Sequence, residues 1–218
     1  MRIALIVISF LLSLSACKEG PAAIKSPLEK LMQGNKRFMA GHPVHPDETL
    51  ARLRELKKGQ HPFAVIIGCS DSRVPPELIF DQGLGDIFSI RTAGNIIGDY
   101  ELGSIEYAVE HLGSKFIVVL GHENCGAIKA FIENPEALKH NDHIKKIIDY
   151  IASEDEEKSL PEADKHQVDK AVRANILHGV HFIKNSLPVL KPLIDKKEVA
   201  VIGAYYDLDN GEVVIIDK

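Results

Sequence analysis

The chain has 218 residues, of which 45% are hydrophobic and 26% are charged. That length suits one domain with a full hydrophobic core. The formal net charge is −5, and no cluster of basic residues offers the positive patch by which proteins bind nucleic acid. We therefore expect one globular domain without a nucleic-acid partner.

The N-terminal segment differs from the rest of the chain in composition. Arg2 is followed by the uncharged run Ile3–Ala16 and then by Cys17. The run is shorter than the ~20 apolar residues of a membrane span, and it suits the ~7–15-residue core of a signal peptide. The end of the run, Leu14-Ser15-Ala16-Cys17, resembles a bacterial lipobox, in which the cysteine becomes lipidated.

These features predict that residues 1–16 are a lipoprotein signal peptide and that residues 17–25 link a lipidated Cys17 to a single domain, 26–218. The protein would then be exported and anchored by this lipid on the periplasmic side of a bacterial membrane. The alternative is an ordinary secretory signal cut near Ala16, which would leave a soluble periplasmic protein.

Two helices are expected at the start of the domain. Ser26-Pro27-Leu28-Glu29 has the pattern of an N-cap, a first-turn proline and a capping box, and predicts a helix to about Met39. A second helix is expected over Asp47–Lys58, with an apolar stripe of leucines and a closing glycine.

The rest of the chain alternates short apolar runs with helical patterns. Expected strands are Phe63–Gly68, Asp86–Arg91, Lys115–Leu120 and Val199–Tyr205, and expected helices are Tyr100–Leu112, Cys125–Ile132 and Ala163–Asn185. Such alternation predicts an α/β fold with a parallel-centred sheet flanked by helices. Asp209-Asn210-Gly211 signals a hairpin into a C-terminal edge strand, Val213–Ile216. The charged run over residues 154–158 is interpreted as a solvated surface.

Metal-binding residue types follow two of the predicted strands. Cys69-Ser70-Asp71-Ser72-Arg73 comes after the first strand, and His122 and Cys125 come after Lys115–Leu120. Ligand sites in α/β sheets lie beyond the carboxyl ends of the strands, so the two segments can face one site. Two thiols and an imidazole are a usual set for catalytic zinc, with a fourth position left open. A Cys69–Cys125 disulfide is the alternative, although it would need neither His122 nor the Asp-x-Arg segment.

Cys-x-Asp-x-Arg followed by His-x-x-Cys resembles the β-class carbonic anhydrases. The resemblance extends over Leu28–Phe38, Asp81–Asn95, Gly103–Val109 and Gly203–Leu208. It implies one Zn²⁺ per chain, held by Cys69, His122 and Cys125. It also implies reversible hydration of CO2 to bicarbonate and a proton by zinc-bound hydroxide. A homodimer or a higher even oligomer is implied as well, with the N-terminal helix packed on a partner subunit.

Asp71 and Arg73 are the expected catalytic residues beside the metal. A guanidinium fork can hold a carboxylate through two hydrogen bonds, and this pair would direct an Asp71 oxygen towards the hydroxide. The family resemblance also implies a closed form in which Asp71 itself becomes the fourth zinc ligand. The simpler alternative is an ion pair that only braces the loop.

Two other functions fit the same motif. Relatives with this zinc motif hydrolyse carbonyl sulfide or carbon disulfide, because the shape of the pocket, and not the ligand set, selects the substrate. A non-catalytic zinc protein that binds bicarbonate or another anion is the third possibility. The Asp71–Arg73 pair and the open fourth position argue against a purely structural zinc.

Overall fold

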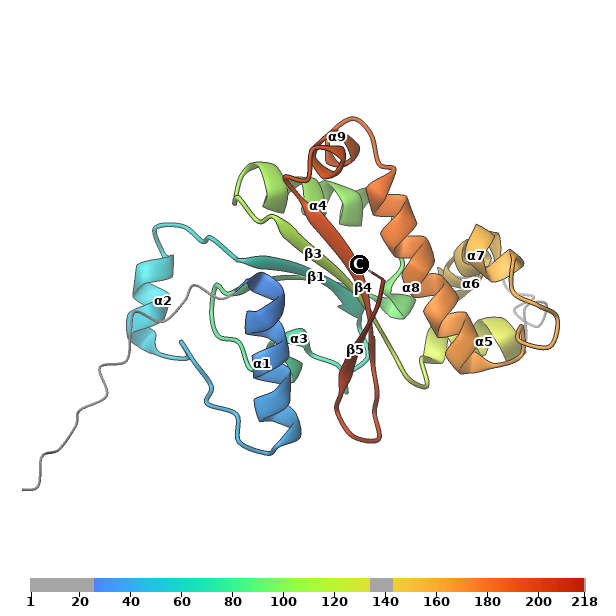
Figure 1. Cartoon of the computed structure of the whole chain (residues 1–218), viewed down its shortest axis with the longest axis horizontal. Coiled ribbons are helices and arrows are strands. Elements are labelled where there is room, and N and C mark those ends of the chain that lie inside the picture. The colour runs from blue at the N-terminus through green and yellow to red at the C-terminus, as the bar shows by residue number, and fades with distance from the viewer. Residues whose placement is uncertain (1–25, 134–142, 218) are drawn as a thin grey trace, which may run out of the picture.

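The computed structural model describes residues 26–133 and 143–217, which are arranged as Figure 1 shows. The predicted signal peptide, the lipidation site Cys17 and the linker lie outside the described residues, and they stay predictions. Within the described ranges, no helix is both long and apolar enough to cross a membrane.

Five strands form one sheet in the order β2-β1-β3-β4-β5. They are β1 (Ala64–Cys69), β2 (Ile87–Thr92), β3 (Phe116–His122), β4 (Ala200–Tyr206) and β5 (Val213–Asp217). All neighbouring pairs are parallel except β4 and β5, which are antiparallel. The predicted α/β fold with a parallel-centred sheet and a C-terminal edge strand is therefore confirmed.

The two central strands explain why their sequences are continuous apolar runs. Every residue of β1 and of β3 is buried, as expected where helices cover both faces of a parallel sheet. β3 continues to His122, two residues beyond its predicted end at Leu120. The histidine is therefore part of the strand and does not lie in a loop after it.

Helix α8 (Val168–Lys184) packs along β3 and β4. It begins five residues later than predicted, but its apolar face is buried at the expected spacing through Val172, Ile176 and Val180. Two strand glycines make room for Ile176. A Cβ atom at Gly121 would lie 2.6 Å from the Ile176 side chain, and one at Gly203 would lie 2.9 Å from it. The helix can therefore lie unusually close to these strands.

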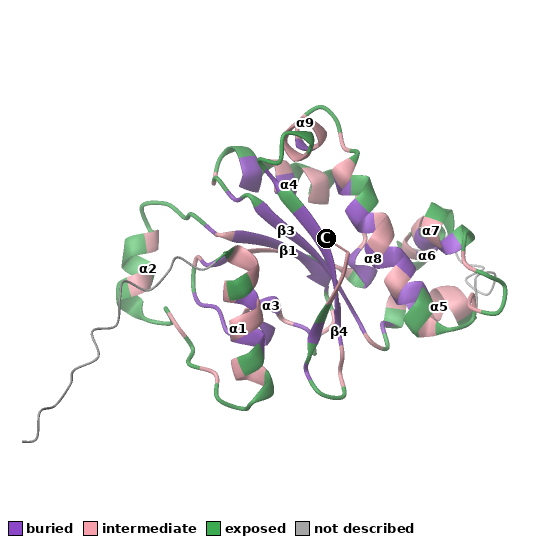
Figure 2. Ribbon diagram, in the orientation of Figure 1, coloured by how far each residue is buried: buried purple, intermediate pink, exposed green. Residues whose placement is uncertain are grey.

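The N-terminal helices differ in how they pack. In α1 (Pro27–Met39), Ser26 and Glu29 form the predicted capping box, and Leu31 is buried. α2 (Leu50–Leu56) is shorter than predicted and begins after an N-cap at Thr49. Its leucine stripe is not covered, because Leu50 and Leu53 are 71% and 53% exposed. Figure 2 shows α2 as mostly exposed, at the edge of the molecule.

The remaining helices include three that the sequence analysis did not predict. α4 (Asp99–Glu110) and α5 (Gly126–Glu133) lie close to their predicted places. Pro75 and Pro76 also predict a short helix, and Thr92–Asn95 predicts a turn; the structure has α3 (Pro76–Ile79) and the 3-10 turn η1 (Ala93–Asn95) there. The unpredicted helices are α6 (His143–Ser153), α7 (Asp155–Lys158) and α9 (Leu190–Asp195). α6 and α7 come from the range 134–166, a polar stretch for which the sequence predicts no helix.

The prediction that residues 154–158 form a solvated surface is wrong for two of them. Asp155 and Lys158 are exposed, but Glu154 and Glu157 are only 1% and 4% exposed. The reason is tertiary: α7 packs against α6 and α8, so residues three apart on its single turn face inward.

Candidate metal centre

The predicted ligands come from two adjacent strands and from the start of a helix. Cys69 is the last residue of β1, and His122 is the last residue of β3. β1 and β3 pair in parallel, with Gly68 opposite Leu120, so both strands end at the same edge of the sheet. Cys125 immediately precedes α5 and completes the group.

The structure brings these three side chains together as predicted. Their ligand atoms all lie within 4.8 Å of one another, and all three residues are buried. Cys69 and Cys125 are free thiols, so the alternative of a disulfide between them is wrong. Two buried thiols beside a buried imidazole are a suitable donor set for zinc.

The ring of His122 is oriented for binding a metal. Its Nδ1 atom lies 2.8 Å from the carbonyl oxygen of Glu123, a contact in which Nδ1–H donates. The other nitrogen, Nε2, is buried and has no hydrogen-bond partner. Burying a nitrogen acceptor without a hydrogen-bond partner lowers the stability of the folded protein. A cation held between this nitrogen and the two thiols would remove that penalty. A carbonyl that fixes the second ring nitrogen is typical of metal-binding histidines.

The two thiols differ in pKa. A hydrogen bond from Cys125 is the main reason why the pKa of Cys69 lies well below its usual range; burial opposes this shift, and the backbone N–H groups of Asp71 and Gly94 add smaller contributions to it. The same contact, together with burial, raises the pKa of Cys125. The site is therefore disposed to hold one negative charge on Cys69 and to attract a cation.

Asp71 and Arg73 form the predicted pair at the mouth of the site. The Nε and Nη2 atoms of Arg73 donate to the two oxygens of Asp71 at 2.9 and 2.7 Å, and the Arg73 backbone N–H also donates to Oδ1 at 2.9 Å. The Arg73 side chain is 51% exposed. Its hydrogen bonds are the main cause that holds the pKa of Asp71 well below its usual range, so Asp71 is ionised at neutral pH.

One cation that supports this loop was not predicted from the sequence. Arg91, in β2, donates to the carbonyl oxygens of Cys69 at 2.9 Å and of Asp71 at 2.6 Å. It lies opposite Gly68 in the β1–β2 register. A charged residue near the end of an otherwise apolar strand was a visible signal, but its target depended on knowing which strands are neighbours.

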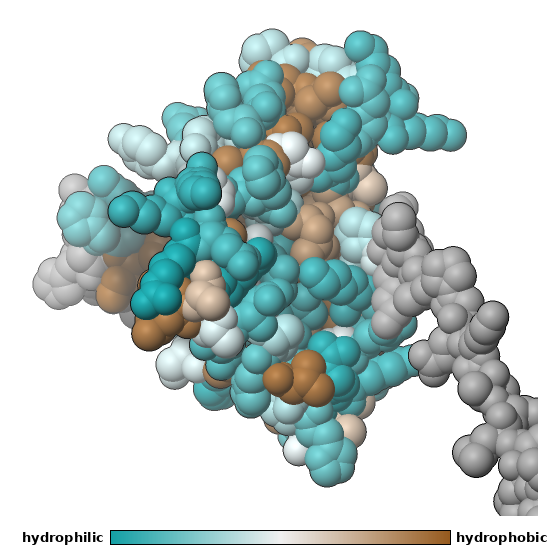
Figure 3. Space-filling model, turned by 90° about the vertical axis from the view of Figure 1, so that its left-hand side faces the viewer, coloured by the Kyte–Doolittle hydropathy of each residue, from teal (hydrophilic) through white to brown (hydrophobic). Residues whose placement is uncertain are grey.

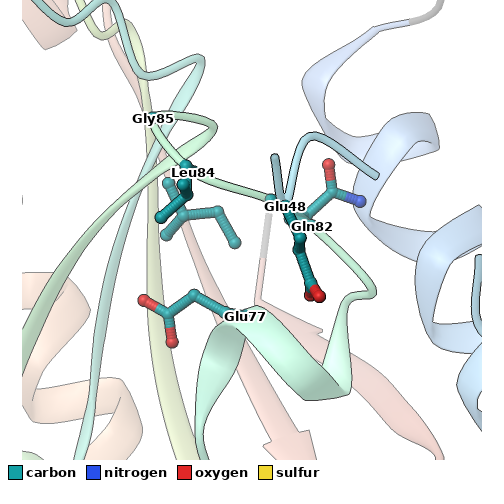
Figure 4. A pocket seen from close by; sticks show the side chains of 7 residues that line it. Glu48, Glu77, Gln82, Leu84 and Gly85 are labelled. Atoms are coloured by element: carbon teal, nitrogen blue, oxygen red, sulfur yellow. The ribbon is translucent and has the colours of Figure 1, made fainter. Parts of the chain in front are cut away.

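A cavity of about 420 Å³ lies away from the three ligands, beside Glu77 of α3, and it is also lined by Glu48, by residues 82–85 and by Ile87. Figure 4 shows that the carboxylates of Glu48 and Glu77 line it, whereas the amide of Gln82 points towards α1. Gln82 was not assigned a role from the sequence, and its amide instead donates to the carbonyl oxygen of Phe80. None of the predicted site residues lines this cavity.

Comparison with known proteins places the chain in a family. Residues 64–213 match the family model described as carbonic anhydrase. "Carbonic anhydrase 2" of Mycobacterium tuberculosis is 39% identical over 190 residues, which cover 86% of this chain and 90% of that protein. Carbonic anhydrases of Synechococcus elongatus and Pseudomonas aeruginosa are 29% and 31% identical, over 88% and 76% of this chain and 72% and 78% of those proteins.

Solved structures agree with the sequence relatives. The β-carbonic anhydrase CcaA has a TM-score of 0.67 and 28% identity, covering 87% of this chain and 95% of that one. A Coccomyxa β-carbonic anhydrase in complex with acetazolamide has a TM-score of 0.68 and 27% identity, covering 90% and 88%. With the Cys69–His122–Cys125 cluster at the carboxyl edge of the sheet, these matches show that the chain belongs to the β-class carbonic anhydrases.

Proposed function

We propose that this protein is a zinc-dependent carbonic anhydrase that reversibly hydrates CO2 to bicarbonate and a proton, with one zinc per chain. The observation that carries the proposal is the buried cluster of Cys69, His122 and Cys125, in which the His122 Nε2 atom has no partner. Three protein ligands leave a fourth position for chemistry, as in other catalytic zinc sites. When bound there, zinc would lower the pKa of a coordinated water to near 7 and supply a hydroxide nucleophile.

Asp71 is the residue we assign to orienting the attacking group, by accepting a hydrogen bond from it. Its Oδ1 atom already accepts two hydrogen bonds, from the Arg73 backbone N–H and from Nε, whereas Oδ2 accepts one. A carboxylate oxygen has about two acceptor positions, so Oδ2 keeps one free. We assign that position to the proton of the attacking group.

Arg73 holds Asp71 in the form that leaves the fourth ligand position open. For Asp71 to become a zinc ligand, as the closed form requires, its carboxylate would have to leave the fork of Arg73. A pair that only braced the loop would not need to sit beside the ligands, yet Asp71 is two residues from Cys69, and Arg73 Nη2 donates at 3.4 Å to the carbonyl oxygen of Asn124, the residue before Cys125. This proximity favours a catalytic role over a bracing one.

The test is CO2 hydration by the purified, zinc-replete domain, followed by stopped flow with a pH indicator. Carbonyl sulfide and carbon disulfide are assayed in parallel, because the same ligand set serves those substrates in relatives. If a sulfur compound is turned over faster than CO2, that compound and not CO2 is the substrate. Full zinc occupancy without turnover of any of the three would favour the non-catalytic, anion-binding alternative.

We also propose that the active protein is a homodimer or a higher even oligomer, in which α1 packs on a partner subunit as the family resemblance implies and the exposed face of α2 adds to the same interface. Leu50 and Leu53 are exposed on this helix, and Leu84 is 43% exposed beside the cavity described above. Figure 3 shows this side of the molecule, where apolar side chains are exposed among hydrophilic ones. Two solved relatives from Sordaria macrospora are described as tetrameric β-carbonic anhydrases. Light scattering should give at least twice the monomer mass, and Leu50→Glu with Leu53→Glu should reduce it.

The proposed location, a lipid anchor at Cys17 on the periplasmic side of a bacterial membrane, rests on the lipobox-like sequence alone. Stable attachment needs two or more acyl chains, which a bacterial lipoprotein cysteine carries. In a bacterial host, Cys17→Ser should move the protein from the membrane to the soluble fraction or leave it unprocessed. Unchanged fractionation and processing would defeat the lipoprotein proposal.

A further inference from the structure

Both polar groups of one residue, Gly94, are used at the metal centre. Its backbone N–H donates to the Sγ atom of Cys69 at 3.4 Å. Its carbonyl oxygen accepts a hydrogen bond of 2.9 Å from the side-chain amide of Asn175. Gly94 thus connects a proposed metal ligand to a residue 81 positions further along the chain.

The conformation of Gly94 makes its orientation dependent on outside support. Its φ of +71° and ψ of +19° lie in the left-handed region, which glycine adopts readily and other residues rarely adopt. A Cβ atom here would lie 3.0 Å from the Cβ of Ala127, so the turn also presses against α5. Packing on α5 limits where the turn can move, while the Asn175 hydrogen bond defines how its peptide is rotated.

Asn175 is itself held firmly. It is 2% exposed and lies on α8 next to Ile176, whose side chain fills the space left by Gly121 and Gly203. Because Gly121 directly precedes His122 in β3, α8 packs against the strand that supplies one ligand while Asn175 supports the turn beside another. A buried amide on such a rigid element is a precise support for a loop.

We propose that Asn175 is a positioning residue of the metal centre, which acts through Gly94 to fix the N–H···S hydrogen bond on the metal-binding sulfur of Cys69. The inference rests on the proposed function, since it takes Cys69 to be a zinc ligand. Asn175 contacts neither metal nor substrate in this role. It sets the position of the sulfur and how much negative charge the sulfur can give to the metal.

Two measurable consequences follow from losing this support. A less fixed sulfur binds metal more weakly, and mutation of such supporting residues costs ~10–100-fold in metal affinity. A sulfur without its N–H donor also holds its electrons at higher energy. The sulfur-to-metal charge-transfer absorption of a cobalt-substituted protein should therefore move to longer wavelength.

The experiment compares Asn175→Leu with a matched control, Asn35→Leu. Leucine has the same branching at Cγ as asparagine and a somewhat larger volume, and it removes the amide; because both sites are buried, the added volume is matched in the two variants. Asn35 is also a buried asparagine, 1% exposed, and it holds backbone groups of Ile79, Gly211 and Val213. Both variants lose a buried amide, so both should melt at lower temperature than the wild type, as followed by circular dichroism.

The readouts are zinc affinity, measured by competition with a chromophoric chelator, and the absorption spectrum of the cobalt-substituted protein. We expect Asn175→Leu to bind zinc at least tenfold more weakly and to show the longer-wavelength band. Asn35→Leu should match the wild type in both. If Asn175→Leu fails to fold, Asn175→Ser takes its place, since its hydroxyl is too short to reach the Gly94 carbonyl.

The inference is overturned if folded Asn175 variants keep wild-type affinity and spectrum, or if Asn35→Leu changes them equally. A wild-type protein that takes up no zinc would instead defeat the proposed function itself. The two failures are therefore distinguishable in the same set of samples.

Discussion

The metal centre and the short helix α7 both bury ionisable side chains, but only the metal centre provides hydrogen-bond donors that stabilise their ionised forms. At the metal centre, Cys69 receives hydrogen bonds that favour its ionised form, and Arg73 does the same for Asp71. At α7, both oxygens of Glu154, its N-cap residue, and one oxygen of Glu157 are buried without any hydrogen-bond partner. Burial therefore raises the pKa of Glu154 to about 9 and that of Glu157 to about 8.

The difference shows that burial alone does not mark a functional site. The metal centre collects negative charge and supplies the donors that stabilise it, so it is prepared for a cation. α7 keeps two carboxyl groups neutral at pH 7, because ionising them in an apolar setting is costly. Four predictions, ordered by the size of their expected effect, test this contrast.

The largest effect is expected from Cys69→Ala. Removing one of the two sulfur ligands leaves His122 and Cys125, too few protein ligands for a catalytic zinc site. Zinc content should fall from one per chain towards zero, and CO2 hydration should be lost with it. Elemental analysis checks the metal. Full zinc occupancy in this variant would remove Cys69 from the ligand set.

Arg73→Ala should lower activity by ~100-fold or more, the size of effect seen when a preorganised electrostatic partner is removed. The freed Asp71 carboxylate would lie near Zn²⁺, and unit charges 4 Å apart interact by ~4 kcal/mol at an effective dielectric of 20. We expect it to turn inward and occupy the fourth ligand position.

Zinc content should nevertheless stay near one per chain in Arg73→Ala, which separates this variant from Cys69→Ala. Arg73→Lys should recover activity only in part, because an ammonium group lacks the planar fork that holds both carboxylate oxygens. A crystal structure of Arg73→Ala with Asp71 still turned away from zinc would contradict the orienting role.

The double variant Glu154→Gln with Glu157→Gln should change how stability depends on pH. Both glutamates have folded pKa values raised above an unfolded value of about 4.5. Between about pH 4.5 and pH 8–9 the folded protein holds protons that the unfolded chain releases. Stability therefore falls as pH rises through this window, by up to ~1.4 kcal/mol per pH unit for each group.

Glutamine cannot ionise, so the variant should gain stability relative to the wild type as pH rises from 5 to 8. The free energy of unfolding, from urea titrations at several pH values, measures this. Other ionisable groups lie near α7: Glu156, which contacts His178 and His181, and Tyr150. Both proteins contain them, so subtracting the two free energies of unfolding at each pH removes their contribution. Parallel pH curves would show that the two carboxyl groups are not buried and neutral.

The smallest effect is expected from Asp155→Asn, in the same turn of α7. This side chain is 93% exposed, and its ion pair with Lys158 is therefore weak. The free energy of unfolding should change by less than about 0.5 kcal/mol at every pH. A pH-dependent change as large as that of the double variant would mean that the charge of the whole segment, and not burial, is responsible.

Features set by neighbouring residues could be predicted from the sequence. The capping box depends only on Ser26 and Glu29, which are three positions apart. The central strands are likewise visible in the sequence as continuous apolar runs. Cys69 and His122 could be brought together because the ends of parallel strands share one edge of a sheet. The DNG turn likewise placed β5 at the sheet edge.

Features set by packing could not be predicted. Arg91 reaches Cys69 from a neighbouring strand, and Asn175 reaches Gly94 from a helix far along the chain. Burial of Glu154 depends on where α7 lies against α8. The leucines of α2 have a regular helical pattern, yet the rest of the described chain leaves Leu50 and Leu53 exposed. A pattern of this kind indicates that a face needs covering, and it does not identify the covering surface.

The pairing of β1 with β3 also constrains how the length of this chain can change during evolution. Side chains alternate between the two faces of a strand, so losing or gaining one residue inside β3 would turn His122 to the opposite face, away from Cys69. Neighbouring side chains can repack around a substitution at a buried position, but they cannot compensate for a one-residue insertion or deletion in the strand. Insertions and deletions should therefore be excluded from the segments Ala64–Cys69 and Phe116–His122 and accumulate in the connections between the strands.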